Sequence, residues 1–399
     1  MSLIPIKNGL DKVRVLIVDD SAVMRKIIAS ALQKNPDIEV AGFANNGIQA
    51  IESIATCCPD IITLDIEMPE MDGLTALREI RKTHKYLPII MFSSMTHQGA
   101  QAAVMALTAG ASDYVAKPSK GGSVDIAFQV LEAELIPKII GLAKRAKTRI
   151  AKEALKEIST PISSQVSPVM VQSSKAHSPI KNTYVQTTLS PINHKPTGQI
   201  NKPVQAVCIG VSTGGPMALM QVFGAFTAPL DVPIFIVQHM PADFTALLAA
   251  RLTATSVMTV KEAEEGEVAL PGMVYIAPGG FHMTVARPGI KTIIHLNTQP
   301  PENSCRPAVD VLYRSAAEVY RDGVLAVILT GMGYDGLKGS EVIKSKGGQI
   351  IVQDEATSVI WGMPGAIVQA GIADAVLPID KMAEEINFRA RKVGMLGRV

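Results

Sequence analysis

The side chains best suited to chemistry in this sequence lie in a glycine-rich turn that carries a single serine. Residues 210–216 read Gly-Val-Ser-Thr-Gly-Gly-Pro and continue an apolar run over 204–211. Gly210, Ser212 and Gly214 fit the G-x-S-x-G pattern, in which a sharp strand-to-helix turn exposes the serine hydroxyl above a sheet. The amides that follow favour a bound phosphate or the oxyanion of an acyl-transfer intermediate. This pattern alone leaves open a nucleophilic serine, a phosphate loop and a purely structural turn.

A nucleophilic serine needs an imidazole to take its proton and a carboxylate to hold that imidazole. His239 follows the apolar run Val-Pro-Ile-Phe-Ile-Val-Gln, and His282 lies in Ala-Pro-Gly-Gly-Phe-His-Met. Three carboxylates compete to orient the base: Asp310, Asp335 and Asp354. Spacing does not choose among these candidates. The order Ser, His, Asp along the chain differs from the Ser, Asp, His order of α/β-hydrolases, so we expect a different fold.

A second set of polar residues follows predicted strands in the first third of the chain: Asp19, Asp20, Asp65, Ser93 and Lys117. The carboxyl ends of parallel strands meet at one edge of a sheet, where ligands bind. Three carboxylates on one edge repel each other unless a cation joins them, and oxygen ligands suit Mg²⁺. We therefore predict a magnesium site, with Lys117 balancing the remaining charge. The alternative is a set of solvated polar residues at loop starts.

The strands that position this second set are predicted from buried-type runs. From Val13 the chain reads Val-Arg-Val-Leu-Ile-Val, which suits a strand buried on both faces, and residues 22–33 are patterned as a helix. Further strands are predicted near Glu39–Gly42, Ile61–Leu64, Ile89–Phe92 and Asp113–Ala116. The alternation of strands and helices predicts a doubly wound parallel sheet.

The glycine-rich turn belongs to a second region with the same alternation. Strands are predicted at Val204–Val211, Ile234–Gln238, Met273–Ala277, Leu325–Thr330 and Gln349–Val352. Helices are predicted at Met217–Phe226, Phe244–Leu252, Ala308–Tyr320 and Leu337–Lys346. This pattern again indicates an α/β domain, with Ser212, His239 and Asp335 just past strand ends on one edge.

The two α/β regions are separated by a segment of different character. Residues 124–158 have helical periodicity that is interrupted at Pro137, and this segment contains many basic residues. Residues 160–202 are rich in Ser, Thr, Pro, Gln and Asn. The first stretch reads as a last helix with a basic extension, and the second as a linker. We expect domains at 11–140 and 203–399, joined by 141–202. The fold class is α/β, with a flavodoxin-like and a Rossmann-like parallel sheet.

Composition limits the class of protein. The chain has 399 residues, and 38 Lys and Arg against 36 Asp and Glu leave a net charge of +2, so no nucleic-acid partner is expected. Its four cysteines suggest neither a disulfide framework nor a zinc site. The start lacks an apolar signal core, and no apolar run approaches the roughly 18 to 20 residues that span a bilayer. We expect a soluble cytoplasmic protein without membrane insertion.

The strand-end set of the first region, with Glu-Met-Pro-Glu-Met-Asp-Gly at 67–73, Tyr114 and Lys117-Pro118, resembles the response-regulator receiver family. The resemblance covers roughly residues 11–140. It implies that Asp65 accepts a phosphoryl group from a histidine kinase and that Mg²⁺ is held by Asp19, Asp20 and Asp65. Ser93, Tyr114 and Lys117 would then be the switch residues.

The second region resembles the chemotaxis protein-glutamate methylesterase (CheB) family. The motifs are Gly-Val-Ser-Thr-Gly-Gly-Pro, Gln-His-Met-Pro, Tyr-Ile-Ala-Pro-Gly-Gly-Phe-His-Met, Arg-Pro-Ala-Val-Asp-Val-Leu from 306 and Leu-Thr-Gly-Met-Gly-Tyr-Asp-Gly from 329. The resemblance implies Ser212 as nucleophile, His239 as base and Asp335 as orienter, with Thr213 and Met332 shaping the site. It further implies demethylation of glutamate methyl esters on chemoreceptors, deamidation of receptor glutamines, and no cofactor for hydrolysis.

The sequence argues against two other classes of function. A transcription factor would need a basic helix-turn-helix, and the second region instead shows buried strands. A nucleotide-binding module would need the second glycine of G-x-G-x-x-G or a P-loop lysine, and residues 210–215 have neither. If the receiver packs over the edge that bears Ser212, phosphorylation of Asp65 is expected to weaken that packing.

Overall fold

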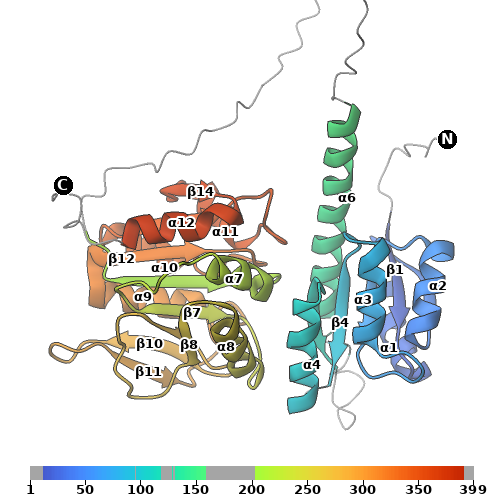
Figure 1. The fold of residues 1–399 in the computed structure, drawn as a ribbon, viewed down its shortest axis with the longest axis horizontal. Coiled ribbons are helices and arrows are strands. Elements are labelled where there is room, and N and C mark those ends of the chain that lie inside the picture. The colour runs from blue at the N-terminus through green and yellow to red at the C-terminus, as the bar shows by residue number, and fades with distance from the viewer. Residues whose placement is uncertain (1–11, 95, 118–127, 129–130, 159–202, 391–399) are drawn as a thin grey trace, which may run out of the picture.

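The computed structural model describes residues 12–94, 96–117, 128, 131–158 and 203–390. Within these ranges the chain builds two separate parallel α/β sheets, each covered by helices, which lie side by side (Figure 1). The predicted class, two parallel-sheet α/β domains, is confirmed.

The first sheet has five strands in the order β2-β1-β3-β4-β5, all parallel. The strands are β1 Val13–Val18, β2 Ile38–Ala44, β3 Ile61–Asp65, β4 Ile89–Ser93 and β5 Asp113–Ala116. Every predicted strand of this region is present. Because β1 and β3 are adjacent and parallel, their carboxyl ends lie together, which brings Asp19 beside Asp65.

The helices of the first sheet are α1 Ala22–Gln33, α2 Gly47–Cys57, α3 Gly73–Thr83 and α4 His97–Thr108. Each begins at a side chain that accepts a backbone hydrogen bond in the first turn, namely Ser21, Asn46, Asp72 and Thr96. Such N-caps satisfy amides that have no partner within the helix. The local sequence therefore defines where these helices start.

The basic helical extension is continuous where a break at Pro137 was predicted. A π-helical turn over Leu131–Leu135 leads directly into α6, Ile136–Ile158. Pro137 lies directly after this π-helical turn, inside a continuous helix, so the proline, which lacks the amide of a regular i→i−4 bond, coincides with a local departure from α-helical geometry. The predicted starting point, Val124, and the linker 160–202 lie outside the described residues.

The second sheet has seven strands in the order β14-β13-β12-β6-β7-β9-β8. The five predicted strands are present as β6 Ala206–Val211, β7 Ile234–Gln238, β9 Met273–Ile276, β12 Val324–Ile328 and β13 Gln349–Gln353. The prediction missed the edge strands β8 Thr259–Glu262 and β14 Ala375–Leu377, and the antiparallel hairpin β10 His282–Ala286 with β11 Ile293–Asn297. These strands are short and partly exposed, so they lack the continuous apolar run of a central strand.

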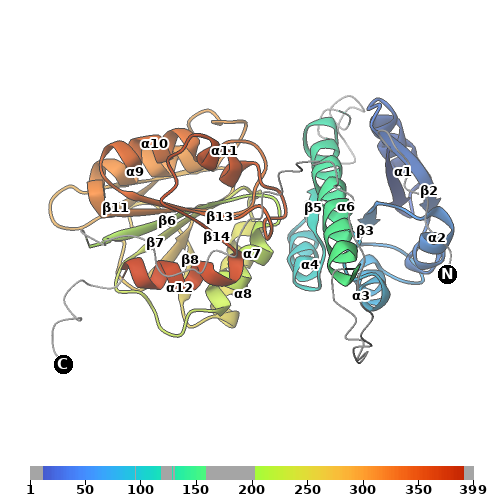
Figure 2. The ribbon, with the colours of Figure 1, turned by 90° about the horizontal axis from the view of Figure 1, so that it is seen from above.

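Helices cover both faces of the second sheet. Figure 2 shows α7 Gly215–Gly224, α8 Phe244–Thr255 and α12 Ile379–Ala390 on one face. The opposite face carries α9 Val309–Tyr320, α10 Leu337–Ser345 and α11 Met363–Gln369, and a 3-10 turn, Arg321–Gly323, follows α9. Alternate residues of β6 point to opposite faces of the sheet and belong to two different apolar clusters. Val207 and Ile209 belong to one cluster, and Ala206 and Cys208 belong to the other.

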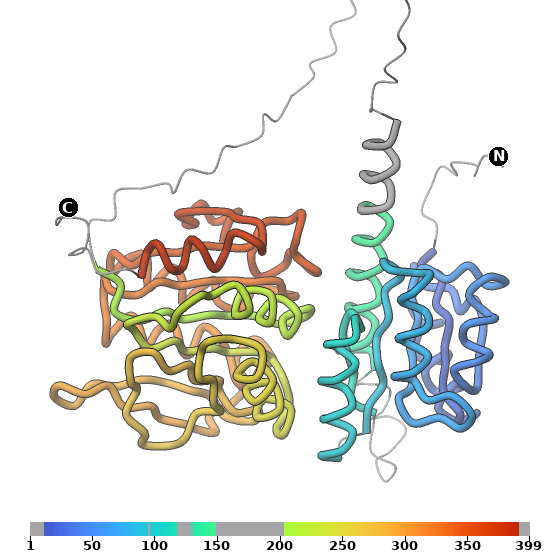
Figure 3. The backbone as a smooth tube through the Cα atoms, in the orientation of Figure 1, coloured from blue at the N-terminus to red at the C-terminus, as the bar shows by residue number. Residues whose placement is uncertain are grey.

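The two sheets meet through helices. In Figure 3 the tube of α4 lies beside those of α7 and α8, and side chains of both sheets share one apolar cluster. Arg145 of α6 donates hydrogen bonds to the carbonyls of Glu355 (2.8 Å) and Ala356 (2.7 Å) in the loop after β13. Among the residues described, no helix has the length and apolar character needed to cross a membrane.

Candidate active site

Ser212 occupies a sharp turn between β6 and α7. Its amide donates to the carbonyl of Thr330 (3.0 Å), and its own carbonyl accepts from the amide of Gly215 (2.8 Å). Gly214 has φ +76°, and a Cβ there would lie 2.5 Å from Val359, so both conformation and space require glycine. This turn leaves Ser212 partly exposed at the start of a helix.

His239 lies beside Ser212 because their strands are neighbours. β6 and β7 pair in parallel with Val211 opposite Gln238, and each candidate residue is the next one along its strand. Gln238 strengthens this arrangement, since its Nε2 donates to the carbonyls of Ser212 (3.0 Å) and His239 (3.2 Å). One amide side chain thus holds the backbone of both residues.

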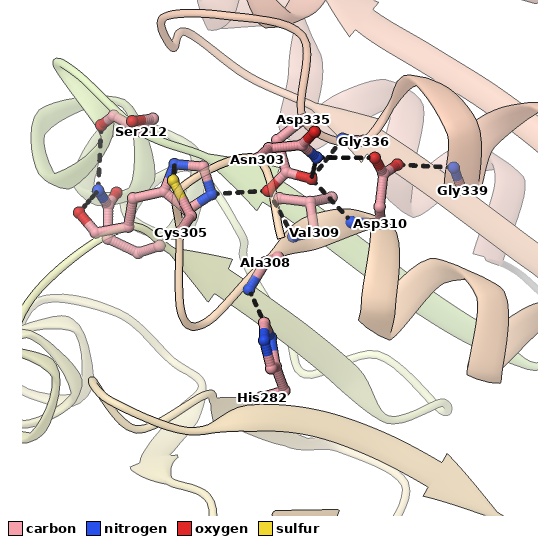
Figure 4. Close-up of polar contacts among 12 residues, drawn as sticks. Ser212, His282, Asn303, Cys305, Ala308, Val309, Asp310, Asp335, Gly336 and Gly339 are labelled. Carbon is pink, nitrogen blue, oxygen red and sulfur yellow. Dashed lines mark hydrogen bonds and ion pairs between the residues drawn. The ribbon is translucent and has the colours of Figure 1, made fainter. Parts of the chain in front are cut away.

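The His239 imidazole is paired with the carboxylate of Asp335. His239 Nε2 and Asp335 Oδ2 are 2.8 Å apart, and Figure 4 shows the labelled Asp335 among its partners. The amides of Val309 (2.7 Å), Asp310 (3.1 Å) and Gly336 (3.0 Å) also donate to this carboxylate. Asp335 is only 3% exposed, so its charge is stabilised by this full set of donors.

The pair shifts the pKa of both partners. Burial alone lowers the pKa of His239, but the hydrogen bond to Asp335 and the contact with Cys305 outweigh it and raise the pKa to about 9. Burial alone raises the pKa of Asp335, whereas the hydrogen bond from His239 and the backbone amides bring it below its usual value. The pair therefore favours an imidazolium beside a carboxylate.

The other nitrogen of the His239 ring, Nδ1, lies 3.5 Å from the Sγ of Cys305 (Figure 4). No hydrogen bond in the described part of the chain joins the Ser212 hydroxyl to the His239 ring. Sequence reasoning missed this thiol, because Cys305 lies far from His239 along the chain and carries no motif of its own. In this arrangement the thiol contacts the nitrogen that a serine nucleophile requires.

The competing candidates have other roles in the structure. His282 lies within β10, where its Nδ1 accepts from the amide of Ala308 (3.2 Å) and its Nε2 lies 3.1 Å from the carbonyl of Pro300. Asp354 accepts hydrogen bonds from Thr357 in its own loop. Asp310 is buried next to Asp335, and within the described residues its carboxylate has no hydrogen bond to a histidine.

Thr213 and Met332 border the turn. Thr213 is 5% exposed, and its carbonyl accepts from Thr330 Oγ1 (2.9 Å). The amide of Gly331 donates to the carbonyl of Ile360 (3.0 Å) and is therefore not available to an oxyanion. The amides of Met332 and Gly333 have no hydrogen-bond partner within the described ranges, which leaves them as candidate oxyanion donors.

The three carboxylates predicted to share one edge of the first sheet lie together. Oxygen atoms of Asp19, Asp20 and Asp65 lie within 4.8 Å of one another. Lys117 Nζ is 3.0 Å from Asp19 Oδ2 and 2.6 Å from Asp65 Oδ2. Burial raises the pKa of Asp65 to about 6 despite the lysine. This set of oxygen donors, with a surplus of negative charge, fits a hard divalent cation such as Mg²⁺.

The remaining residues of the acidic set connect this site to the second sheet. Ser93 Oγ donates to the carbonyl of Gly99 (2.6 Å) at the start of α4. Tyr114 is 7% exposed and its ring stacks on Phe244, the first residue of α8. Tyr114 thus links the first sheet directly to the helix that follows His239.

Fold and site together define a response-regulator hydrolase: a phosphoacceptor-type acidic site on one parallel sheet, and a serine turn with a histidine-carboxylate pair on another. A family model described as CheB methylesterase matches residues 207–386, and one described as response regulator receiver domain matches residues 15–127. The chain belongs to the CheB methylesterase family and carries a receiver domain. The expected class of enzyme, a hydrolase with a regulatory receiver, is confirmed.

Curated relatives cover almost the whole chain. The protein-glutamate methylesterase/protein-glutamine glutaminase of Trichodesmium erythraeum (strain IMS101) is 44% identical over 380 residues, which are 95% of this chain and 99% of the relative. The protein of the same name from Pyrococcus abyssi (strain GE5 / Orsay) is 40% identical over 390 residues, 97% of each chain. The crystal structure of the Thermotoga maritima CheB methylesterase catalytic domain is 45% identical, with a TM-score of 0.46, and covers 47% of this chain and 99% of that one.

Proposed function

We propose that the chain hydrolyses glutamate methyl esters in protein substrates, releasing methanol, and deamidates glutamines, using Ser212, His239 and Asp335. The observation that carries this assignment is the 2.8 Å contact between His239 and Asp335, one strand away from the serine turn. A buried histidine-carboxylate pair beside a turn-borne hydroxyl is suited to acyl transfer. A phosphate-binding loop does not require a histidine-carboxylate pair, so the His239–Asp335 pair favours hydrolysis over nucleotide binding.

The proposed reaction begins with attack of the Ser212 hydroxyl on the acyl carbon. His239 takes the hydroxyl proton at Nδ1, while Asp335 holds the Nε2 proton and stabilises the imidazolium that forms. The amides of Met332 and Gly333, with Thr213 nearby, receive the oxyanion. His239 then protonates the departing methanol or ammonia, and water cleaves the acyl-enzyme by the same steps. No cofactor takes part in these steps.

The His239 ring must be available to Ser212 for this reaction. Its Nδ1 faces Cys305 in the described structure, so the reactive geometry requires the hydroxyl to displace the thiol as its partner. A hydroxyl is the better hydrogen-bond donor of the two, because S–H is a weak donor. Binding of substrate, which orders the serine side chain, would favour the exchange.

We infer the substrates and partners from the family. The protein substrates are methyl-accepting chemoreceptors in the cytoplasm, and a histidine kinase is the phosphodonor for Asp65. Asp19, Asp20 and Asp65 would hold Mg²⁺, which would neutralise charge on the phosphoryl oxygens. Lys117 would contact the phosphoryl group on Asp65. The burial and the raised pKa of Asp65 are typical of a carboxyl group at a functional site, which supports Asp65 as the phosphoacceptor.

The receiver domain is proposed to inhibit hydrolysis until it is phosphorylated. α4 packs against α7 and α8, which follow Ser212 and His239 respectively, so docking of the receiver covers this edge. Phosphorylation adds negative charge at Asp65 and draws Ser93 toward it, which alters the α4 start through the Ser93–Gly99 bond and withdraws Tyr114. We propose domain limits of 11–140 and 203–399, with 141–202 as the connection.

The test is methanol release from a methylated receptor fragment. Replacement of Ser212 by alanine is expected to lower turnover by several orders of magnitude, because nucleophile and base act as a unit. The control is Ser345→Ala, which removes an exposed hydroxyl of α10. Methanol release by Ser212→Ala at the unmodified rate would remove Ser212 as nucleophile, and nucleotide binding without hydrolysis would favour the phosphate-loop alternative.

A further inference from the structure

We infer that Asn303 is a positioning residue of the active site, which fixes Asp335 by joining it to a second buried carboxylate, Asp310. The inference rests on the proposed function of the His239–Asp335 pair. Asn303 Nδ2 donates one hydrogen bond to Asp335 Oδ1 (2.9 Å) and one to Asp310 Oδ2 (3.0 Å). Figure 4 shows the amide between the two carboxylates. Both protons of the amide nitrogen are therefore used, and the orientation of the amide is defined.

Two carboxylates in one buried site are costly. Asp310 is fully buried and Asp335 is 3% exposed, so water stabilises neither charge, and the two repel each other. Asp335 has the His239 ring and three backbone amides as further donors. In the described residues, the Asp310 carboxylate accepts only from Gly339 N (2.6 Å) and Asn303. Asp310 therefore depends on Asn303 more than Asp335 does.

The charges around Asp310 and Asp335 also indicate that the two carboxylates depend on the Asn303 amide. Burial raises the pKa of Asp310, the charge of Asp335 raises it further, and the hydrogen bonds from Gly339 and Asn303 oppose the rise. The titratable groups near the two carboxylates are His239, Glu302, Tyr313 and Arg314, and Cys305 contacts the opposite nitrogen of the His239 ring. Arg314 is held by Glu302 through two contacts of 2.8 and 2.5 Å, so its charge is largely committed. The neutral amide is the group that separates the two acids.

The backbone explains why an asparagine stands at this position. Asn303 has φ +53° and Ser304 φ +61°, in a tight turn closed by hydrogen bonds between the backbones of Glu302 and Cys305 (3.1 and 2.9 Å). Asparagine tolerates this left-handed conformation better than most residues with a side chain. The site requires a left-handed residue with two donors and no charge. Glycine lacks the donors and aspartate adds a third carboxylate, whereas asparagine meets all three requirements.

Loss of the amide should act on catalysis through Asp335. Without Asn303, the repulsion between the carboxylates is relieved when Asp310 takes up a proton, and Asp335 loses one of the contacts that fix its orientation. The negative charge near His239 falls, so the pKa of His239 falls as well. Misorientation of Asp335 lowers the rate of proton transfer, whereas the surface that binds substrate is unchanged.

The experiment compares Asn303→Gly with Ser304→Gly in the full chain. The two positions are adjacent and both have a left-handed backbone, so glycine is tolerated at each. Only Asn303→Gly removes the amide that donates to both Asp310 and Asp335. We expect kcat of Asn303→Gly for methanol release to fall about ten- to a hundredfold with KM little changed, from the loss of hydrogen bonds to charged groups. The pKa of His239, followed by NMR, should fall in this variant and stay unchanged in Ser304→Gly.

A rescue variant separates positioning from general stability. In Asn303→Gly/Asp310→Asn, the second substitution removes the charge that repels Asp335 and keeps an oxygen that can accept from Gly339, so part of kcat, or folding if the single variant fails to fold, should return. Equal kcat and His239 pKa in Asn303→Gly and Ser304→Gly would overturn the inference, as would a double variant no better than the single one. Retained activity in Ser212→Ala or Asp335→Asn would instead refute the proposed function.

Discussion

The rings of Tyr114 and Phe244 are stacked, with centroids 4.7 Å apart and an angle of 11° between their planes. Tyr114 belongs to β5 of the receiver sheet and Phe244 is the first residue of α8, shortly after His239. The pair joins the two domains directly. It is therefore one contact through which docking of the receiver can be tested.

Removal of this stacking should activate the enzyme without phosphorylation. An aromatic pair contributes about 0.5–1.5 kcal/mol beyond its buried area, so Tyr114→Ala should raise the basal rate of methanol release by about two- to tenfold. The control is Phe43→Ala, which removes an aromatic ring that is 53% exposed on β2. If Tyr114→Ala has the basal rate of the unmodified chain, the receiver does not inhibit through this contact.

Chelation of divalent cations should affect regulation and not hydrolysis. Asp19, Asp20 and Asp65 provide a hard-cation site, whereas the His239–Asp335 pair supplies no comparable set of oxygens. EDTA should therefore abolish the gain in rate produced by a small phosphodonor and leave the rate without phosphodonor intact. Loss of the basal rate on chelation, restored by Mg²⁺, would contradict a hydrolysis that needs no cofactor.

The raised pKa of His239 predicts how stability depends on pH. The pKa is about 9 in the folded protein and 6.5 in the reference state, so the folded form binds the proton more tightly. This stabilisation is complete below about pH 6.5 and is lost as the pH rises through about 9. Thermal unfolding between pH 6 and 10 should show the decline, and His239→Gln should flatten it. The rate of hydrolysis should rise over the same range, since the base must be neutral.

The contact between Cys305 and His239 predicts a shift of that pH profile. The Cys305 hydrogen bond contributes to the raised pKa of His239, and the thiol occupies the nitrogen that Ser212 needs. Cys305→Ala should therefore move the rise in kcat to lower pH. Cys58→Ala, at an exposed helix end, provides the matched control. An unchanged profile in Cys305→Ala would mean that the thiol does not influence the base.

Glycine substitutions can test the shape of the serine turn. Gly214 and Gly266 have nearly the same left-handed backbone, with φ +76° and +77°, so alanine strains both to a similar degree. Only at Gly214 would the new Cβ meet a neighbour, Val359 at 2.5 Å, whereas nothing lies within 4 Å at Gly266. Gly214→Ala should lower kcat at least tenfold more than Gly266→Ala, with unfolding midpoints measured for both. Equal kcat values would show that the turn tolerates displacement.

Much of this protein can be predicted from local patterns in its sequence. The buried-type runs gave all central strands of both sheets, because a strand covered on both faces must be apolar throughout. The glycines around Ser212 indicate a sharp turn, because their backbone conformations suit few other residues. The acidic residues after β1 and β3 could be grouped, because the carboxyl ends of parallel strands share one edge. These features depend only on neighbours along the chain.

Contacts between distant residues were decided by the tertiary structure. The order of the strands places His239, and not His282, beside Ser212, and the path of the loop after β12 brings Asp335 to the His239 ring. The turn at 302–305 presents Asn303 and Cys305 to the same pair, although nothing in its local pattern indicates this role. Periodicity encodes which face of an element is buried, whereas the partner of a polar side chain depends on how separate elements pack.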